Sequence, residues 1–348
     1  MSITKTKFGT MPDGKEVYSY TLDNGKKLKA EILSYGATVR SLFVKDKDGN
    51  FKDVVLGLET LSDYLDNPAY YGAAVGRVAN RVLKGTFELN GERYNLDIND
   101  GDNSLHGGFH GFSHYVWDVC EGGTDDEPEL KMSILSPDGD GGYPGNLKMT
   151  VTYKLTAQNG LLIHYEGVSD KDTVVNMTNH SYFNLNGAGD DNIYSLDLQM
   201  NCDYFTPNTD ECLPNGEILS VKNTPMDFTD GKKVGKDILS DFEQLKKFGG
   251  YDHNFAIRGR GFRKCAVVSS EKTGIKMEVY TNTPGVQLYT GNSIDEKRNC
   301  KNGIIYKPHD ALCLETQYFP NSTGYSHFES PILKKDEKYD MTTEYRFI

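Results

Sequence analysis

A histidine near the middle of the chain stands in a segment that could carry acid–base chemistry. Residues 176–184 read NMTNHSYFN, and a strand there would place His180 and Tyr182 on one face and Asn179 and Ser181 on the other. A packed strand buries aliphatic residues, so His and Tyr on one face are more typical of a polar cleft. An interior histidine that is satisfied by a backbone carbonyl explains this segment, taken alone, equally well.

A second candidate is a carboxylate at the end of an apolar run. Glu315 follows the residues Leu-Cys-Leu in the sequence ALCLETQYFP, which we expect to form a strand. A glutamate in such a place is costly to bury unless it is paired or functional, and burial perturbs its pKa. Glu315 is therefore a weak pointer to a site.

Two further segments offer polar side chains that could bind a ligand. Asn80 and Arg81, in GRVANRV, provide several fixed donors, although a surface pair of Arg77 and Arg81 is the simpler interpretation of that motif alone. Asp252, in GGYDHNF, could bind sugar hydroxyls, and it could equally cap the amides of a local turn.

Residues 103–114, NSLHGGFHGFSH, carry three histidines at the spacing of one helical face. Three glycines in the same stretch make a helix improbable, so the spacing does not predict a metal site, and we expect no bound metal. We expect instead a glycine-rich loop that lets a ligand approach the backbone closely and that presents His106 to it.

Turn chemistry predicts the elements that must position these side chains. Four hairpins are expected, within residues 17–33, 87–94, 147–168 and 267–281, because alternating runs flank Asn-Gly or similar turn residues. Helical patterns are short and occur at residues 61–70 and 237–248. No linker or repeat divides the sequence, so we expect residues 1–348 to form one all-β domain, an antiparallel sandwich or barrel.

Charge and cysteine content exclude several function classes. Thirty-eight Lys and Arg against 50 Asp and Glu give a net charge of −12 without a basic block, which argues against nucleic acid and anionic membranes as partners. Six cysteines without metal-site spacing are expected to be free thiols, and with no apolar signal core they indicate a cytoplasmic protein. Phosphate-loop and dinucleotide motifs are absent from the sequence, so no nucleotide cofactor is predicted.

Together and in this order, the segments resemble the aldose 1-epimerase (galactose mutarotase) family. The motifs that carry the resemblance are LSYGAT at 33–38, GRVANR at 76–81, NSLHGG at 103–108, GYPG at 142–145, NHSYFNL at 179–185, YDHNF at 251–255 and ETQ at 315–317. Gly141 and Asn321 depart from the family, which often has acidic residues there, but both positions concern loops only.

The resemblance implies a large antiparallel β-sandwich of the supersandwich type with a few short helices. It also implies action on free hexoses without a cofactor, with His180 as general acid and Glu315 as general base. The sugar-binding roles fall on six residues: Asn80, Arg81, His106, Tyr182, Asp252 and Gln287. Near neutral pH an imidazolium and a carboxylate suit the two proton-transfer tasks, so we expect these protonation states.

Three alternatives remain compatible with the residues. A hexose-6-phosphate 1-epimerase would need a cluster of Arg and Lys to hold the phosphate. A glycoside hydrolase would use two opposed carboxylates, for which Asp252 and Glu315 are the candidates. A non-catalytic sugar-binding module would keep the pocket without the chemistry. A monomer and a homodimer both agree with the sequence.

Overall fold

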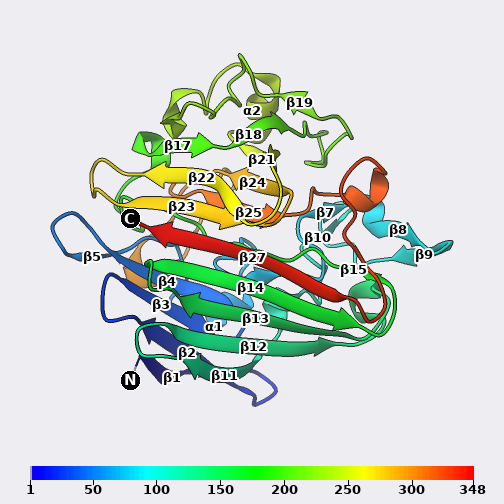
Figure 1. Cartoon of the computed structure of the whole chain (residues 1–348), viewed down its shortest axis with the longest axis horizontal. Coiled ribbons are helices and arrows are strands. Elements are labelled where there is room, and N and C mark those ends of the chain that lie inside the picture. The colour runs from blue at the N-terminus through cyan, green and yellow to red at the C-terminus, as the bar shows by residue number, and fades with distance from the viewer. Residues whose placement is uncertain (1) are drawn as a thin grey trace.

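Antiparallel β-sheets dominate the computed structural model, which describes residues 2–348 (Figure 1). The largest sheet has nine strands and runs through the molecule from the lower to the upper part of Figure 1. In spatial order its strands are β11 (Asp118–Gly123), β12 (Pro128–Ser136), β13 (Leu147–Leu155), β14 (Gly160–Ser169), β27 (Lys338–Phe347), β23 (Lys276–Thr281), β22 (Arg263–Ser269), β17 (Asp197–Met200) and β20 (Lys232–Lys233).

Two five-stranded sheets pack against this large sheet. The first is formed by β1 (Ile3–Thr10), β2 (Glu16–Asp23), β3 (Leu28–Leu33), β4 (Thr38–Lys45) and β5 (Phe51–Asp53). The second is formed by β19 (Leu219–Ser220), β18 (Cys202–Phe205), β21 (Asp252–Ile257), β24 (Gly285–Tyr289) and β25 (Cys313–Gln317). Strands β2 and β3 contact β12 and β13, and β25 lies on β27 through Tyr345, whose hydroxyl donates to the carbonyl of Leu314. The predicted antiparallel sandwich is therefore confirmed.

Alternation of residue types explains why the sheets face one another. In β12 the side chains of Leu130, Met132 and Ile134 are buried and alternate with more exposed neighbours, which is the pattern of a strand with one solvated face. These three residues belong to one hydrophobic cluster that also includes Leu288 of β24 and Ile32 of β3. One core thus joins the three large sheets.

All four predicted hairpins are present, as β2–β3, β8 (Thr86–Leu89) with β9 (Glu92–Asn95), β13–β14 and β22–β23. The turn between β8 and β9 shows the reason. Asn90 and Gly91 have φ values of 54° and 80°, and a two-residue hairpin turn of this kind needs two residues that tolerate positive φ.

Short strand pairs and single helical turns complete the fold. The pairs are β6 (Ala74–Val75) with β16 (Thr178–Asn179), β7 (Arg81–Val82) with β10 (Ser104–Leu105), β8 (Thr86–Leu89) with β9 (Glu92–Asn95), and β15 (Thr173–Val174) with β26 (Ile332–Leu333). Short 3-10 turns lie at Leu83–Gly85, Phe112–His114, Asp140–Gly142, Ile193–Ser195, Val234–Lys236, Lys301–Gly303 and Ser322–Gly324.

The two α-helices are α1 (Leu61–Leu65) and α2 (Glu243–Phe248). The prediction of a helix over 237–248 is wrong for its first half. Asp237, the expected start, binds the ammonium of Lys232 at 2.7 Å, and Leu239 is 69% exposed rather than packed. Neither helix, in the part of the chain that is described, is long and apolar enough to cross a membrane.

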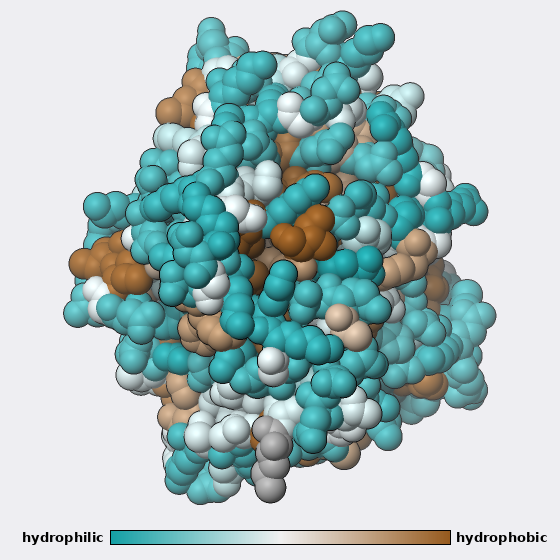
Figure 2. Space-filling model, turned by 60° about the vertical axis from the view of Figure 1, so that its left-hand side comes forward, coloured by the Kyte–Doolittle hydropathy of each residue, from teal (hydrophilic) through white to brown (hydrophobic). Residues whose placement is uncertain are grey.

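The face of the molecule shown in Figure 2 is mainly hydrophilic, and hydrophobic residues gather on it in small separate groups. Such scattered groups are ordinary for a folded chain, because polar atoms alone cannot cover its surface. The more informative feature is a polar pocket where the short strand pairs meet the edge of the second five-stranded sheet.

Candidate active site

A pocket of about 400 Å³ brings together residues from segments that are far apart in the sequence. Of the eight predicted site residues, seven line it, and the eighth, Gln287, contacts one of them, Asp252. The lining residues are Pro68, Ala69, Tyr70, Tyr71, Asn80, Arg81, Leu105, His106, His180, Tyr182, Asp252, Tyr289, Ser293, Ile294, Asp295, Glu296 and Glu315.

The segment around His180 is extended, but its regular strand is shorter than predicted, because β16 ends at Asn179. The predicted alternation of side chains is nevertheless confirmed. His180 and Tyr182 line the pocket, whereas Asn179 donates from Nδ2 to the carbonyl oxygen of Gly72 at 2.9 Å. Ser181 donates from its hydroxyl to Oδ1 of Asn179 at 2.6 Å. The two outward residues therefore hold the backbone that carries the two inward ones.

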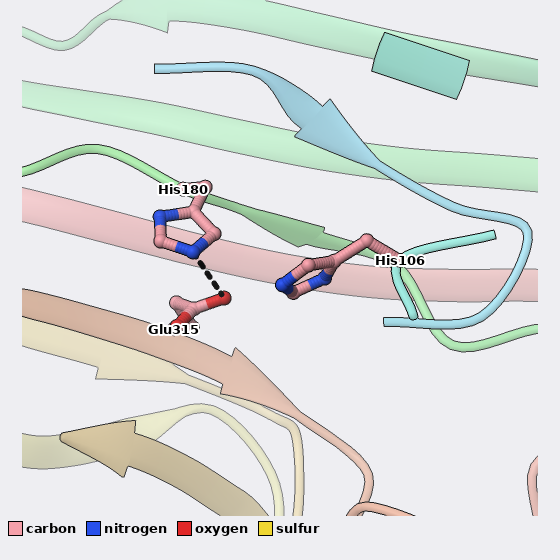
Figure 3. A group of neighbouring side chains, drawn as sticks. All are labelled: His106, His180 and Glu315. Carbon is pink, nitrogen blue, oxygen red and sulfur yellow. Dashed lines mark ion pairs between the residues drawn. The ribbon is translucent and has the colours of Figure 1, made fainter. Parts of the chain in front are cut away.

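Glu315 lies in the middle of β25 rather than at the end of a strand. Its neighbours across the sheet are Gln287 of β24 and, beyond it, Asn254 of β21. Asp252 and Tyr289 lie two residues from Asn254 and Gln287, and hence on the same face of the sheet, and they line the pocket together with Glu315. Figure 3 shows His180 and Glu315 facing each other, with Nε2 and Oε2 separated by 3.8 Å.

Burial controls the protonation of this pair. It lowers the pKa of His180 from 6.5 to about 4 and, together with the charge of Asp252, raises the pKa of Glu315 well above its usual value. Burial therefore favours the uncharged forms of both groups, a neutral imidazole and a carboxylic acid. The expected imidazolium and carboxylate stay a prediction, and burial works against them because a low-dielectric site disfavours charged groups.

His106 is held by a reciprocal backbone contact with Asn80. The amide of His106 donates to the carbonyl oxygen of Asn80 at 3.0 Å, and the amide of Asn80 donates to Nδ1 of His106 at 3.2 Å. Both residues adopt positive φ, at 52° and 61°. Since Nδ1 accepts a hydrogen bond, the neutral ring carries its own hydrogen on Nε2, and His106 offers the pocket a hydrogen-bond donor.

The loop after His106 is irregular, as predicted, but its glycines serve protein packing. A Cβ atom on Gly107 would lie 2.0 Å from the carbonyl oxygen of Gly76, and one on Gly108 would lie 2.5 Å from Cβ of Asp97. Glycine is therefore required where the loop meets these two segments. We expected these glycines to let a ligand approach the backbone. They instead let the loop pack closely against Gly76 and Asp97.

His106, His180 and Glu315 converge, with one ligand atom from each within 4.8 Å of the others (Figure 3). Two imidazoles and a carboxylate are a set of groups that can bind zinc or iron. The contact of His106 with Asn80 does not suit such a site, because a nitrogen that carries a proton cannot ligate a metal. The cluster fits a polar organic ligand better.

Arg81 and Asp252 form another wall of the pocket, and each is oriented by a partner. Nε of Arg81 donates to Oδ2 of Asp100 at 2.7 Å. Oδ1 of Asp252 accepts from Nε2 of Gln287 at 2.7 Å, while the thiol of Cys212 lies 3.3 Å from Oδ2. Gln287 therefore holds Asp252 from behind. Its contact with a ligand, implied by the resemblance, stays a prediction.

Arg77 is not the surface residue that its motif alone indicated. It is 1% exposed, and its guanidinium donates to the carbonyl oxygens of Pro144 and Gly145 and to the side chain of Ser136. Arginine suits this place because its five N–H groups can satisfy several acceptors at once. Its role is to tie the GRVANR segment to the GYPG turn.

Sequence reasoning missed three aromatic or sulfur-containing side chains at the site. The ring of Tyr70 lies 4.7 Å from that of His106 and 6.1 Å from that of His180. No sequence pattern singles out Tyr70, because its positive φ of 56° follows from the folded loop. Tyr289 and Cys313 could have been found, since each lies two residues from a predicted site residue on the same strand face.

Tyr182 contributes its ring to the pocket, while its hydroxyl is engaged by the protein. That hydroxyl donates to the carbonyl oxygen of Ala69 at 2.9 Å, and the ring stacks on His180 at 4.9 Å between centroids. The stacked ring fixes the plane of the imidazole, whose two nitrogens face Glu315 and Cys313.

The arrangement can move protons to and from one small polar ligand. A carboxyl group and an imidazole 3.8 Å apart can exchange protons with two oxygens of a molecule bound beside them. Arg81, His106 and Asp252 add hydrogen-bonding groups of both kinds around that space.

Comparison with known proteins identifies the family. The family model described as aldose 1-epimerase matches residues 18–346. A galactose mutarotase of Bos taurus is 42% identical over 350 aligned positions, covering 100% of this chain and 99% of that protein. An aldose 1-epimerase of Haemophilus influenzae is 36% identical over 340 positions, with 97% of both chains covered.

Solved structures support the same conclusion. The crystal structure of galactose 1-epimerase from Lactobacillus acidophilus superposes with a TM-score of 0.88 at 32% identity, covering 99% of this chain and 98% of that chain. An aldose epimerase homologue from C. elegans gives a TM-score of 0.85 at 31% identity, covering 93% and 96%. On the family match, the relatives and the shared fold, the chain belongs to the aldose 1-epimerase family.

Proposed function

We propose that this protein is an aldose 1-epimerase that interconverts the α- and β-anomers of free hexoses such as galactose and glucose. The observation that carries the proposal is the buried pair of His180 and Glu315, 3.8 Å apart and facing the same pocket. Relatives that bear the names galactose mutarotase and aldose 1-epimerase, at 36–42% identity, support the same reaction.

The reaction needs two proton transfers in each direction. Glu315, as carboxylate, takes the proton of the anomeric hydroxyl while His180, as imidazolium, gives a proton to the ring oxygen. The bond between C1 and the ring oxygen breaks, and C1 becomes the carbonyl carbon of the open-chain aldehyde. Rotation about the C1–C2 bond presents the other carbonyl face, and both transfers then run backward to close the ring.

Binding of the sugar favours the charged forms that burial disfavours. An anomeric hydroxyl that donates to Glu315 stabilises its carboxylate form and leaves the shared proton on His180. Because the reaction moves only protons and one C–O bond, it needs no redox or group-transfer cofactor. Each positioned acid or base contributes a rate factor of about 10²–10⁴.

The remaining polar residues hold the parts of the sugar that do not react. Arg81 and the Nε2–H of His106 donate to hydroxyl oxygens, Asp252 accepts from hydroxyls, and Asn80 lies beside them in the pocket wall. The ring of Tyr182 forms a flat wall beside His180. Gln287 supports binding indirectly, through its hydrogen bond to Asp252.

A phosphorylated hexose is disfavoured by the charges around the pocket. Of the described residues that line it, Arg81 is the only Lys or Arg, whereas Asp252, Asp295, Glu296 and Glu315 are acidic. A phosphate group needs several cationic donors, and four carboxyl groups against one guanidinium work against it. A neutral monosaccharide fits the same surroundings.

The test is polarimetry of freshly dissolved α-D-galactose and α-D-glucose with the wild type and the Glu315→Gln variant. The amide keeps the size of the side chain but cannot accept a proton, so we expect kcat to fall by about 10²–10⁴-fold. His180→Asn should lose activity to a similar extent while it still binds galactose. A well-folded Glu315→Gln variant with near-normal turnover would remove Glu315 from the role of base.

We further propose that residues 1–348 act as one domain in the cytoplasm, as a monomer or homodimer with a free monosaccharide as ligand. The match to the family model over residues 18–346 and the single core that joins the large sheets support one domain. Six free cysteines, four of them buried, agree with a reducing compartment. Light scattering during gel filtration distinguishes monomer from dimer.

A further inference from the structure

The imidazole of His180 contacts two residues of the same strand, and only one of them belongs to the proposed acid–base pair. Nε2 faces Glu315, while Nδ1 lies 3.5 Å from Sγ of Cys313. Cys313 and Glu315 are two positions apart on β25 and share its pocket face. Strand β25 therefore holds the imidazole at both of its nitrogen atoms.

Two tyrosine rings fix the plane of the imidazole and so make these contacts specific. Tyr182 is inclined by 23° to the His180 ring at 4.9 Å between centroids, and Tyr70 by 19° at 6.1 Å. With the plane set by near-parallel rings, the nitrogens can reach only groups along the ring edge. Cys313 is fully buried, so its sulfur holds that position without competition from bulk solvent.

The proposed reaction decides which nitrogen must carry the permanent hydrogen. His180 passes a proton to the ring oxygen of the sugar from Nε2, the atom that faces Glu315, and recovers it there. Nε2 therefore alternates between a bare and a protonated state. A neutral imidazole has one hydrogen, so that hydrogen must reside on Nδ1, where it needs an acceptor.

We propose that Cys313 is a positioning residue whose sulfur accepts the Nδ1–H of His180 and thereby reserves Nε2 for proton exchange with Glu315 and the sugar. The assignment of the tautomer rests on the proposed function, whereas the contact between Nδ1 and the sulfur is a feature of the structure itself. The choice of sulfur has a chemical effect. A carboxylate at Nδ1, as in hydrolase triads, stabilises the imidazolium, whereas a thiol is a weak acceptor and leaves the imidazolium a strong acid.

The other aromatic groups around the His180 ring carry no charge that would change its tautomer. They come from four further places in the fold: Tyr70 from the loop before β6, His106 from the loop after β10, Tyr182 from the segment of His180 itself, and Tyr289 from β24. Burial raises the pKa of Tyr70, Tyr182 and Tyr289 and lowers that of His106. All four are therefore neutral near pH 7. The thiol of Cys313, whose pKa burial also raises, is neutral as well, and Glu315 is the remaining titratable contact.

The direct test is the nitrogen NMR spectrum of protein labelled with ¹⁵N-histidine at pH 7. A bare imidazole nitrogen and a protonated one resonate far apart, so the spectrum reports the tautomer without any measurement of activity. The chain has eight histidines, and the His180→Asn variant identifies the signals that belong to His180. We expect a protonated Nδ1 and a bare Nε2. A proton on Nε2 would overturn the proposal.

Substitution of Cys313 tests what the contact does. In Cys313→Ala we expect a mixture of tautomers and a loss in kcat of about fivefold, the factor that corresponds to one neutral hydrogen bond. Cys313→Ser restores an acceptor, so the tautomer should return with kcat within about twofold of wild type. Because oxygen is the better acceptor for an imidazolium, the acid limb of the pH profile should move to higher pH.

Cys265→Ala is the matched control, since Cys265 is equally buried but lies in β22, among core residues. It should leave both the tautomer and the pH profile unchanged. A Cys313→Ala variant with a wild-type tautomer and pH profile would overturn the proposal. If the wild type shows the Nδ1–H tautomer but does not accelerate mutarotation, the assignment of Cys313 stands and the proposed function fails.

Discussion

The low pKa of His180 predicts an enzyme that remains active in mild acid. The pair of His180 and Glu315 works when it holds one proton, and it takes up a second only as the pH falls through the pKa of His180, which burial lowers to about 4. At pH 5 about 90% of the free enzyme then keeps the one-proton form, against about 3% if the histidine titrated at its ordinary value of ~6.5. The two cases differ by about thirtyfold.

The assay is kcat/KM for α-D-galactose from pH 4.5 to 8, because this ratio reports the pKa values of the free enzyme. Initial rates of optical rotation are corrected with an enzyme-free blank at each pH, since acid and base also accelerate mutarotation without the enzyme. We expect kcat/KM at pH 5 to stay close to its value at pH 7. On the alkaline side, activity should be lost as the raised pKa of Glu315 is passed and the pair loses its only proton.

The refuting result is a value of kcat/KM at pH 5 below about a tenth of its value at pH 7, with the circular dichroism spectrum unchanged. That outcome would mean that His180 titrates as an exposed histidine does, and that burial does not set its protonation. Circular dichroism is needed at each pH because the buried histidines also make the fold sensitive to acid. Unfolding would otherwise imitate the loss of a catalytic group.

Three further predictions concern the same physical causes. Burial lowers the pKa of His180 to about 4 and that of His253 to about 3, so the unfolded chain takes up protons first and the free energy of unfolding falls as the pH drops from 7. Urea unfolding at pH 7 and pH 5 should show a loss of about 2 kcal/mol for each histidine. Equal stability at both pH values would contradict this. Arg77→Met leaves buried carbonyl groups without a donor and should cost at least about 3 kcal/mol in the free energy of unfolding, whereas the exposed Arg93→Met control should cost almost nothing. Tyr70→Ala opens both pocket histidines to water and should move the acid limb of the pH profile upward, while Tyr70→Phe should match wild type; an unmoved limb in the alanine variant would exclude a shielding role.

Several elements of the fold follow from short-range chemistry and were predictable for that reason. The hairpin turn at Asn90-Gly91 needs two residues with positive φ, and that requirement can be read from the residue types alone. The helix expected over 237–248 failed because Asp237 binds Lys232 instead of capping the helix, a choice that depends on the surrounding fold. Local patterns therefore predict an element well where no competing partner intervenes.

For the site, the sequence by itself determined the residue types and, through the ordered family motifs, which of them to combine. It also determined that His180 and Tyr182 face one way and Asn179 the other, because alternation is a local property of an extended chain. The same rule relates Cys313 to Glu315.

Only the tertiary structure decided how these groups act. It placed Cys313 and Glu315 against a histidine more than 130 positions away in the chain, and it put Gln287 behind Asp252 rather than in the pocket. It also buried the pair, which lowers the pKa of His180 and raises that of Glu315 and so works against the expected ion pair. The physical reason is that pKa values and contacts depend on desolvation and on long-range pairing between strands, and neither is encoded in the neighbours of a residue along the sequence.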